Sequence, residues 1–135
     1  MRKAVKKVLI SIAIVVLVLI VLGGLSLAMA FAGLEETTNL EIGTVDLAQI
    51  PDGSYTGSYT NFRWNTTVKV TVTDHQITAI EPVKIQSGRK NLARELTEDI
   101  LQQQTADVDV VSGATASSHA YLKAVENALI KGAEG

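Results

Sequence analysis

A long uncharged apolar segment limits what this chain can fold into more than any other feature. Val8 to Leu34 is a run of 27 residues without a charged side chain. As a helix it would span about 40 Å, and the hydrocarbon core of a bilayer is about 30 Å thick. A helix also satisfies all of its backbone groups internally, as lipid requires. We therefore expect residues 8–34 to form one transmembrane helix in contact with membrane lipid.

The charges before this segment predict its orientation. Four basic residues and no acidic residue precede it, so residues 1–7 are expected in the cytoplasm and the rest of the chain outside it. A cleaved signal peptide is the alternative, because Ala28-Met29-Ala30 resembles a cleavage site. The apolar run before that site is about 20 residues, longer than the typical signal of about 7–15. We favour a retained, single-pass anchor with an extracytoplasmic domain.

The composition after the anchor excludes several classes of function. Residues 35–135 carry eight basic and fourteen acidic side chains, a balance of −6. An acidic domain is not expected to bind nucleic acid. The chain has no cysteine, which rules out disulfides and thiolate metal sites. Its two histidines, His75 and His119, lie far apart in the sequence without metal-ligand spacing, so we expect no metal site.

The hydrophobic pattern predicts an α+β domain at residues 52–135, joined to the anchor by a linker at residues 35–51. Period-two alternation predicts strands at 53–60 and 66–73, and a third at 77–85 that Pro82 confines to an edge or a bulge. Apolar stripes predict helices at 90–104 and from Thr115 to 131–132, with a short strand or extended run at 108–111. The expected architecture is a small antiparallel sheet packed with two helices.

The stretch from Asp109 to Ser118 is the part that points to chemistry. Gly113 and Ala114 are small enough to let backbone N–H groups approach a ligand closely. Hydroxyl side chains gather around the start of the last helix, where unpaired N–H groups and the helix dipole favour an anion such as phosphate. The same residues also suit ordinary helix capping. The hydroxyl-bearing residues are Ser112, Thr115, Ser117 and Ser118.

Within it, Asp109-Val-Val-Ser-Gly-Ala-Thr115 resembles the flavinylation motif Asp-x-x-(Ser/Thr)-Gly-Ala-Thr of the FMN-binding domain family. That family includes the flavin-carrying subunits of the sodium-translocating NADH:quinone reductase and of the Rnf complex. The resemblance extends over about residues 43–131. It implies FMN as cofactor, joined to Thr115 through a phosphoester by a Mg²⁺-dependent FAD:protein FMN transferase. It also implies cofactor-binding roles for Asp109, Ser112, Gly113 and Ala114. Ser117 lies beyond the motif, and we expect it to bind the cofactor through its hydroxyl at the start of the helix.

Asp109 is harder to explain, because a carboxylate close to a phosphate is unfavourable unless a cation bridges the two. Our hypothesis is that Asp109 orders the loop for the transferase, with the Mg²⁺ that this enzyme uses.

Three further features have two interpretations each. Gly57, between Tyr55 and Tyr59, either leaves room for a flat ligand or marks a bulge or aromatic contact. The segment 61–65 holds the single Trp beside Arg63, and either covers the flavin ring or contacts a partner, or folds over the core. Basic residues at the start of helix 90–104 oppose its dipole. They form a solvated face, or one of them reaches the flavin's negative groups; they are Arg89, Lys90 and Arg94.

The sequence lacks a nucleophile–base pair, paired catalytic carboxylates and a dinucleotide fingerprint. The resemblance therefore favours an electron-transfer flavoprotein component over a stand-alone enzyme. We expect it to relay electrons from a membrane redox partner or quinone reductase to an external acceptor. One alternative is a module that binds FMN or another phosphate ligand non-covalently, as a sensor or assembly subunit. The other is an interaction domain without flavin, in which the loop only caps a helix.

Overall fold

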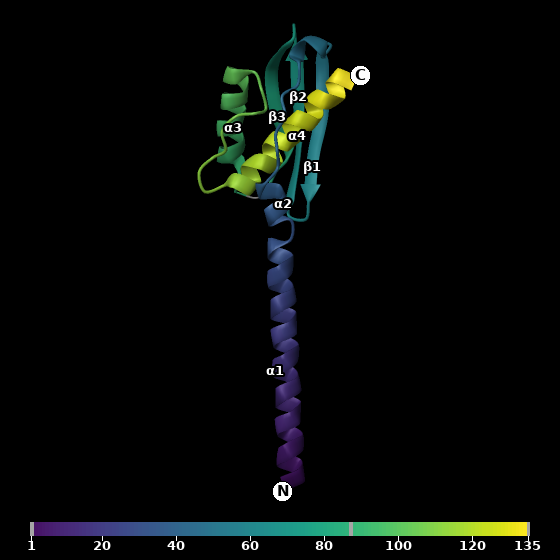
Figure 1. Ribbon diagram of the computed structural model, residues 1–135, viewed down its shortest axis with the longest axis vertical. Helices are drawn as coiled ribbons and strands as arrows, with labels where there is room; N and C mark the ends of the chain where they lie inside the picture. Colours follow the sequence, from purple (N-terminus) through teal and green to yellow (C-terminus); the bar gives the residue numbers. More distant parts are fainter. Residues whose placement is uncertain (1, 87, 135) are drawn as a thin grey trace. The chain divides into compact units, whose positions relative to one another are not determined.

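The computed structural model describes residues 2–86 and 88–134 and divides the chain into two units, Met1–Ala32 and Gly33–Gly135. The first unit contains helix α1, Arg2–Phe31 (Figure 1). None of the side chains of this helix is buried. At 1.5 Å per residue, its 30 residues extend about 45 Å. The helix is long and apolar enough to cross a membrane, as the sequence predicts for this region.

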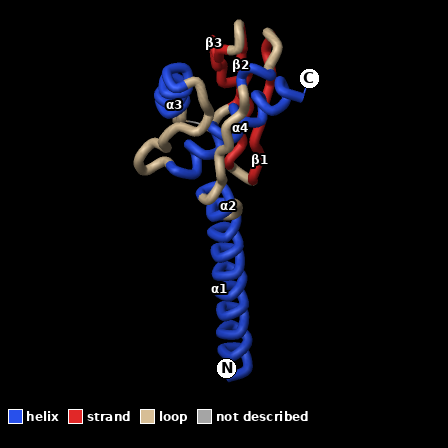
Figure 2. Tube along the Cα trace, turned by 45° about the horizontal axis from the view of Figure 1, so that its top comes forward, coloured by secondary structure: helices blue, strands red, loops and turns tan. Residues whose placement is uncertain are grey.

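The second unit is built on a three-stranded antiparallel sheet. Strands β1 (Gly53–Asn61), β2 (Trp64–Thr73) and β3 (Gln76–Lys84) follow one another in space as they do in sequence (Figure 2). Asp74 and His75 join β2 to β3 with positive φ at both residues, as a tight two-residue hairpin turn requires. Pro82 lies in β3, on the edge of the sheet and beside a register shift. The predicted strands and the placement of Pro82 are confirmed.

Strand β2 shows why the sheet has one covered face. Every second side chain is buried, and those between are half-buried or exposed. Helix α4, Thr115–Glu134, lies across the buried face (Figure 1) and contributes most of the remaining core. The predicted apolar residues of this helix are all buried: Ala120, Leu122, Ala124, Val125, Ala128 and Leu129.

Gly57 serves this packing. A Cβ atom at Gly57 would overlap the Ala124 carbonyl oxygen and the Ala128 backbone nitrogen. The glycine therefore lets the backbone of α4 approach β1 closely. The space between the two tyrosines is filled by this helix, so the interpretation of Gly57 as a seat for a flat ligand is wrong.

Helix α3, Lys90–Gln103, lies beside β3 and α4. Its buried side chains are the predicted stripe, Leu92, Ala93, Leu96 and Ile100. Gln104 caps the helix with φ +58, and its side-chain amide donates to the Ile77 carbonyl at 3.0 Å and accepts from the Ile77 N–H at 2.7 Å. One glutamine side chain thus joins the end of α3 to the start of β3.

Three local details differ from the sequence-based expectation. A short helix α2 (Leu34–Thr38) and a 3-10 turn (Leu47–Gln49) occupy parts of the segment 35–51, and Thr37 and Ile50 are fully buried there. Residues 108–111 form no regular strand. Helix α4 runs past the expected end at 131–132, because Gly132 packs closely against Ile50 and Tyr55 and remains helical.

Candidate functional site

The loop before α4 folds back on the first turn of the helix. The Val111 N–H donates to the fully buried Ser118 Oγ at 3.1 Å, and the Ala114 N–H donates to the Val111 carbonyl at 3.0 Å. Gly113 has φ +79, a conformation that glycine adopts without the strain a Cβ brings. These contacts explain the choice of glycine and fix where the helix begins, which is Thr115 as predicted.

Thr115 lies on the wall of an open cavity of about 350 Å³. This volume falls in the range of about 300–1,000 Å³ usual for small-molecule sites. The cavity is formed where α2, the β1–β2 turn, the start of α3 and the start of α4 meet. Its lining residues are Leu34, Thr38, Arg63, Trp64, Arg89 and the run Gly113–Ser117.

The predicted site residues divide into two groups. Gly113, Ala114 and Thr115 line the cavity together with Ser117. Ser112 and Asp109 are exposed, and neither is among the described residues that line the cavity. The structure therefore brings four of the six residues together on one wall.

The aromatic–basic turn forms another wall. Trp64 is 2% exposed and packs against Ala116 and Ala120 of α4. The Arg63 guanidinium lies over the indole ring, with Cζ 4.7 Å from its centroid, an arrangement that a cation–π attraction favours. The turn thus folds over part of the core, as one interpretation of segment 61–65 expected, and it also lines the cavity. That it covers the flavin ring stays a prediction.

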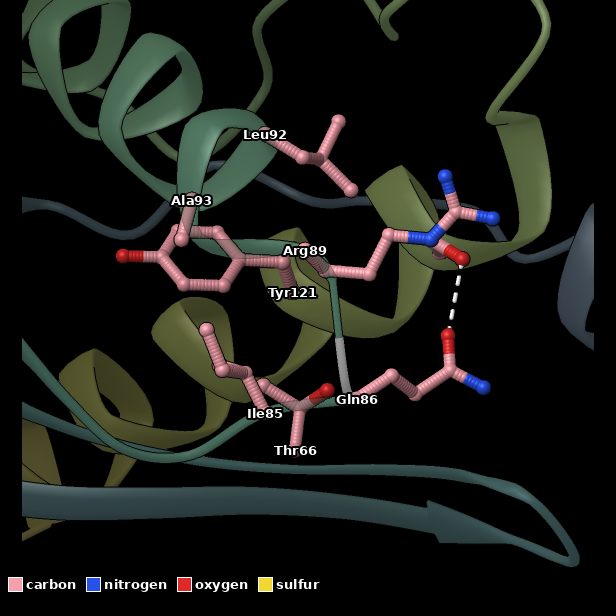
Figure 3. A pocket seen from close by; sticks show the side chains of 8 residues that line it. Thr66, Ile85, Gln86, Arg89, Leu92, Ala93 and Tyr121 are labelled. Carbon is pink, nitrogen blue, oxygen red and sulfur yellow. Dashed lines mark hydrogen bonds between the residues drawn. The ribbon is translucent and has the colours of Figure 1, made fainter.

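Gln86 joins three segments of the site. Its amide nitrogen donates to the Arg63 carbonyl at 3.0 Å, and its amide oxygen accepts from the Ser117 hydroxyl at 2.9 Å (Figure 3). One side chain therefore connects the β1–β2 turn, the end of the sheet and the first turn of α4. The Ser117 hydroxyl, predicted to bind cofactor, is engaged by Gln86 in this arrangement.

A much smaller cavity of about 10 Å³ lies behind Gln86 and Arg89. It has room for about one water molecule. Tyr121 borders it, 2% exposed, with its hydroxyl 2.6 Å from the Thr97 hydroxyl. Burial raises the pKa of Tyr121 above its ordinary value, and the hydrogen bond with Thr97 opposes that shift. Tyr121 is thus a neutral, buried residue in the lining of the small cavity, which Gln86, Arg89 and Ser117 also line.

These features fit a phosphate-bearing ligand. A helix N-terminus offers backbone N–H groups to an anion, Arg63 and Arg89 supply positive charge, and Thr115 supplies a half-buried hydroxyl. Sequence reasoning missed Leu34, Thr38 and Gln86 as parts of this region, because none of them belongs to a recognisable local pattern.

Comparison with known families identifies the fold and its ligand. The family described as FMN-binding domain matches residues 62–130, slightly more than half of the chain. The chain belongs to the FMN-binding domain family. FMN is accordingly its cofactor, as the motif at 109–115 predicted. A comparison with curated proteins finds no match.

The matched part of this FMN-binding domain runs from the β1–β2 turn through α3 to near the end of α4. It includes Arg63, Gln86, Arg89 and the whole loop before Thr115. Leu34 and Thr38, which complete the cavity, lie before it. The segment that follows α1 in the sequence thus adds a wall to the cavity of the matched domain.

Proposed function

We propose that this protein carries FMN covalently on Thr115 and relays electrons between a membrane donor and an acceptor outside the cytoplasm. The position of Thr115 is the observation that supports this proposal most directly. Thr115 is the half-buried first residue of α4, and it lines a cavity together with two arginines. Family membership supports flavin as the group that occupies this cavity. The motif supports a phosphoester as the form of attachment.

The attachment step uses the Thr115 hydroxyl as nucleophile. Its oxygen attacks the flavin-side phosphorus of FAD, the bond between the two phosphates breaks, AMP leaves, and the hydroxyl proton is released. The product is a phosphodiester with one negative charge at the N-terminus of α4, where the helix dipole stabilises it. A Mg²⁺-dependent FAD:protein FMN transferase would catalyse this step. We propose that exposed Asp109 and Ser112 are contacted by that enzyme rather than by the bound flavin.

Covalent attachment suits a domain outside the cell. A flavin bound non-covalently would dissociate and be lost by dilution, and a phosphoester prevents that loss. When bound, FMN supplies reversible electron transfer, and the chain's own residues attach it, orient it and set its electrostatic environment. The lipid-spanning length of α1 supports a role beside a membrane redox partner or quinone reductase.

The decisive experiment is denaturing mass spectrometry of the full chain produced with and without the transferase. We expect the added mass of one FMN less one water, together with in-gel flavin fluorescence. Thr115→Ala should remain folded and lose both signals, because removing a hydroxyl at a helix start costs about 1 kcal/mol. Thr115→Ser keeps a hydroxyl at the same place and serves as the matched control.

Two results would contradict this proposal. The bare polypeptide mass with flavin released on denaturation would favour the non-covalent FMN-binding module. Flavin on Ser112 or Ser117 after Thr115→Ala would mean that another hydroxyl is the acceptor.

The extracytoplasmic location has its own test. The chain has no cysteine, so a single exposed Ser58→Cys can be labelled with a membrane-impermeant maleimide in intact cells. We expect labelling before lysis, whereas Lys3→Cys should react only after lysis. Protection of Ser58→Cys in intact cells would contradict the proposed orientation.

A further inference from the structure

Three cationic side chains line the cavity that contains Thr115 or the cavity next to it. Arg63 and Arg89 line the cavity that contains Thr115, and both also line an adjoining open cavity of about 480 Å³. Lys84 lines that second cavity at the end of β3. The two cavities therefore share their arginines, and the positive charge extends from the Thr115 wall towards the edge of the sheet.

This charge contrasts with the rest of the domain. Residues 35–135 have a balance of −6, yet the described lining of both cavities contains no Asp or Glu. Cations that share a cavity without a carboxylate repel one another unless an anion lies between them. The arrangement favours a ligand with negative charge at more than one point along its length.

The other charged groups around these cavities lie outside their lining. On α2, Glu35 and Glu36 are exposed, and in the loop before α4, Asp109 is exposed. On α4, His119 is half-buried, with its ring Nδ1 3.3 Å from the Thr37 carbonyl oxygen. Arg63, Lys84 and Arg89 are therefore the charges that line the two cavities.

We propose that Arg63 and Arg89, with Lys84 behind them, hold the pyrimidine end of the flavin ring and stabilise the negative charge it gains on reduction. This rests on the proposed attachment at Thr115, which would join the flavin's phosphate to the wall of a cavity that both arginines also line. The helix N-terminus already offers backbone N–H groups to the phosphodiester. The two guanidinium groups are therefore available to interact with the ring as well.

The positions of these side chains are supported by their neighbours. Trp64 lies under the Arg63 guanidinium, and Gln86 holds the Arg63 carbonyl at 3.0 Å. Arg89 is fixed through its backbone, because its N–H donates to the Gln86 carbonyl at 3.2 Å and its carbonyl accepts from Ala93 at 3.0 Å. Gln86 thus holds the backbones of both arginines, and Trp64 supports the Arg63 guanidinium.

The charge balance gives the proposal a specific signature. Two electrons taken up with two protons leave the ring's charge unchanged, whereas two electrons with one proton add one negative charge. Cations beside the ring favour uptake of one proton. The midpoint potential of a two-electron couple then changes by about 30 mV per pH unit, and by about 59 mV when two protons are taken up.

The test is the pH dependence of the midpoint potential of the flavinylated full chain in detergent, between about pH 6 and pH 8. We expect a slope of about 30 mV per pH unit over the whole range for the unmodified chain, and a slope that rises towards about 59 mV per pH unit at the acid end of the range for Arg63→Gln/Arg89→Gln. Arg94→Gln is the matched control, since Arg94 is an exposed arginine on the same helix that lines neither cavity. Arg63→Lys/Arg89→Lys should keep the slope of the unmodified chain.

A second measurement does not depend on covalent attachment. In a Thr115→Ala background, free FMN is titrated by quenching of its fluorescence, and the double glutamine variant should bind at least tenfold more weakly than the Arg94→Gln control. Equal slopes and equal affinities for these two variants would overturn the proposal. Flavin content is measured separately by in-gel fluorescence, so a chain that binds FMN through the arginines but carries none covalently contradicts only the attachment at Thr115.

Discussion

Ser118 is the residue whose removal should loosen the flavin-attachment loop most directly. Its side chain is fully buried in the first turn of α4, and its oxygen accepts the Val111 N–H at 3.1 Å. Replacing Ser118 with Ala leaves that half-buried N–H without its partner, at a cost of about 1–3 kcal/mol. The higher helix propensity of Ala offsets roughly 0.5 kcal/mol. We expect a net loss of about 1–2 kcal/mol in the free energy of unfolding.

That loss is measurable with the single tryptophan. Trp64 is 2% exposed against the first two turns of α4, so its fluorescence reports unfolding of the domain that follows α1. For a domain of about 100 residues, 1 kcal/mol corresponds to roughly 4–8 °C, and the thermal midpoint should fall by about 5–15 °C. Ser58→Ala, an exposed serine in β1, is the control and should change stability by less than about 0.5 kcal/mol.

The same substitution should also affect the attachment reaction. With Val111 released, the run from Ser112 to Ala114 samples more conformations and Thr115 is presented less often in a fixed position. We expect slower FMN transfer to Ser118→Ala at a temperature where the domain is folded. A thermal midpoint and a transfer rate equal to those of Ser58→Ala would refute the inference that this hydrogen bond orders the loop.

Three other perturbations have distinct expected outcomes. Gly57→Ala should lower the free energy of unfolding by about 3 kcal/mol or more, because its Cβ would overlap the backbone of α4. Gly113→Ala has open space around it and should cost only the left-handed strain of about 1–2 kcal/mol. Equal losses in denaturant unfolding would contradict the packing argument. Gln86→Met should lower the free energy of unfolding by about 1–2 kcal/mol through loss of two partly exposed hydrogen bonds. In a Ser117→Ala background the effect should be about half as large, because only the bond to the Arg63 carbonyl remains to be lost; an undiminished effect would contradict the coupling of Gln86 with Ser117. Burial raises the pKa of Tyr121, so the unfolded chain loses this proton at a lower pH than the folded chain does. The contribution of Tyr121 to stability should therefore decline as pH rises above about 10. Tyr121→Phe should give a flatter curve of stability against pH in that range, and a curve equal to that of the unmodified chain would refute the assignment.

The fold was largely predictable where neighbouring residues share one environment. The alternation of β2 and the apolar stripe of α3 follow from which faces are buried, and both are confirmed. The third strand, with Pro82 at the sheet edge, is also confirmed. The short helix α2 and the 3-10 turn were missed, because scattered apolar residues in a polar segment show no period.

The continuous stretch before α4 is the part of the site that the sequence predicts directly, whereas segment 61–65 and Arg89 each had two interpretations. Gly113 and Ala114 are predicted from their small size, and Thr115 from its hydroxyl at a helix start and from the motif that it completes; all three line the cavity. The opposite walls come from α2, the β1–β2 turn and the start of α3, which are far apart in sequence. Gln86 had no signal at all, because its role depends on two partners that only folding brings within hydrogen-bond distance.

The sequence by itself determined the division into an apolar helix and an acidic domain, the periodic elements of that domain, and the loop that ends at Thr115. These are properties of contiguous residues, since hydrophobic period and backbone preference act locally. Tertiary structure decided that Gly57 receives a helix rather than a ligand, and that cations from two distant segments share a cavity with the threonine. Such placements arise because α4 packs across the sheet, and no local pattern encodes which distant side chains that packing brings together.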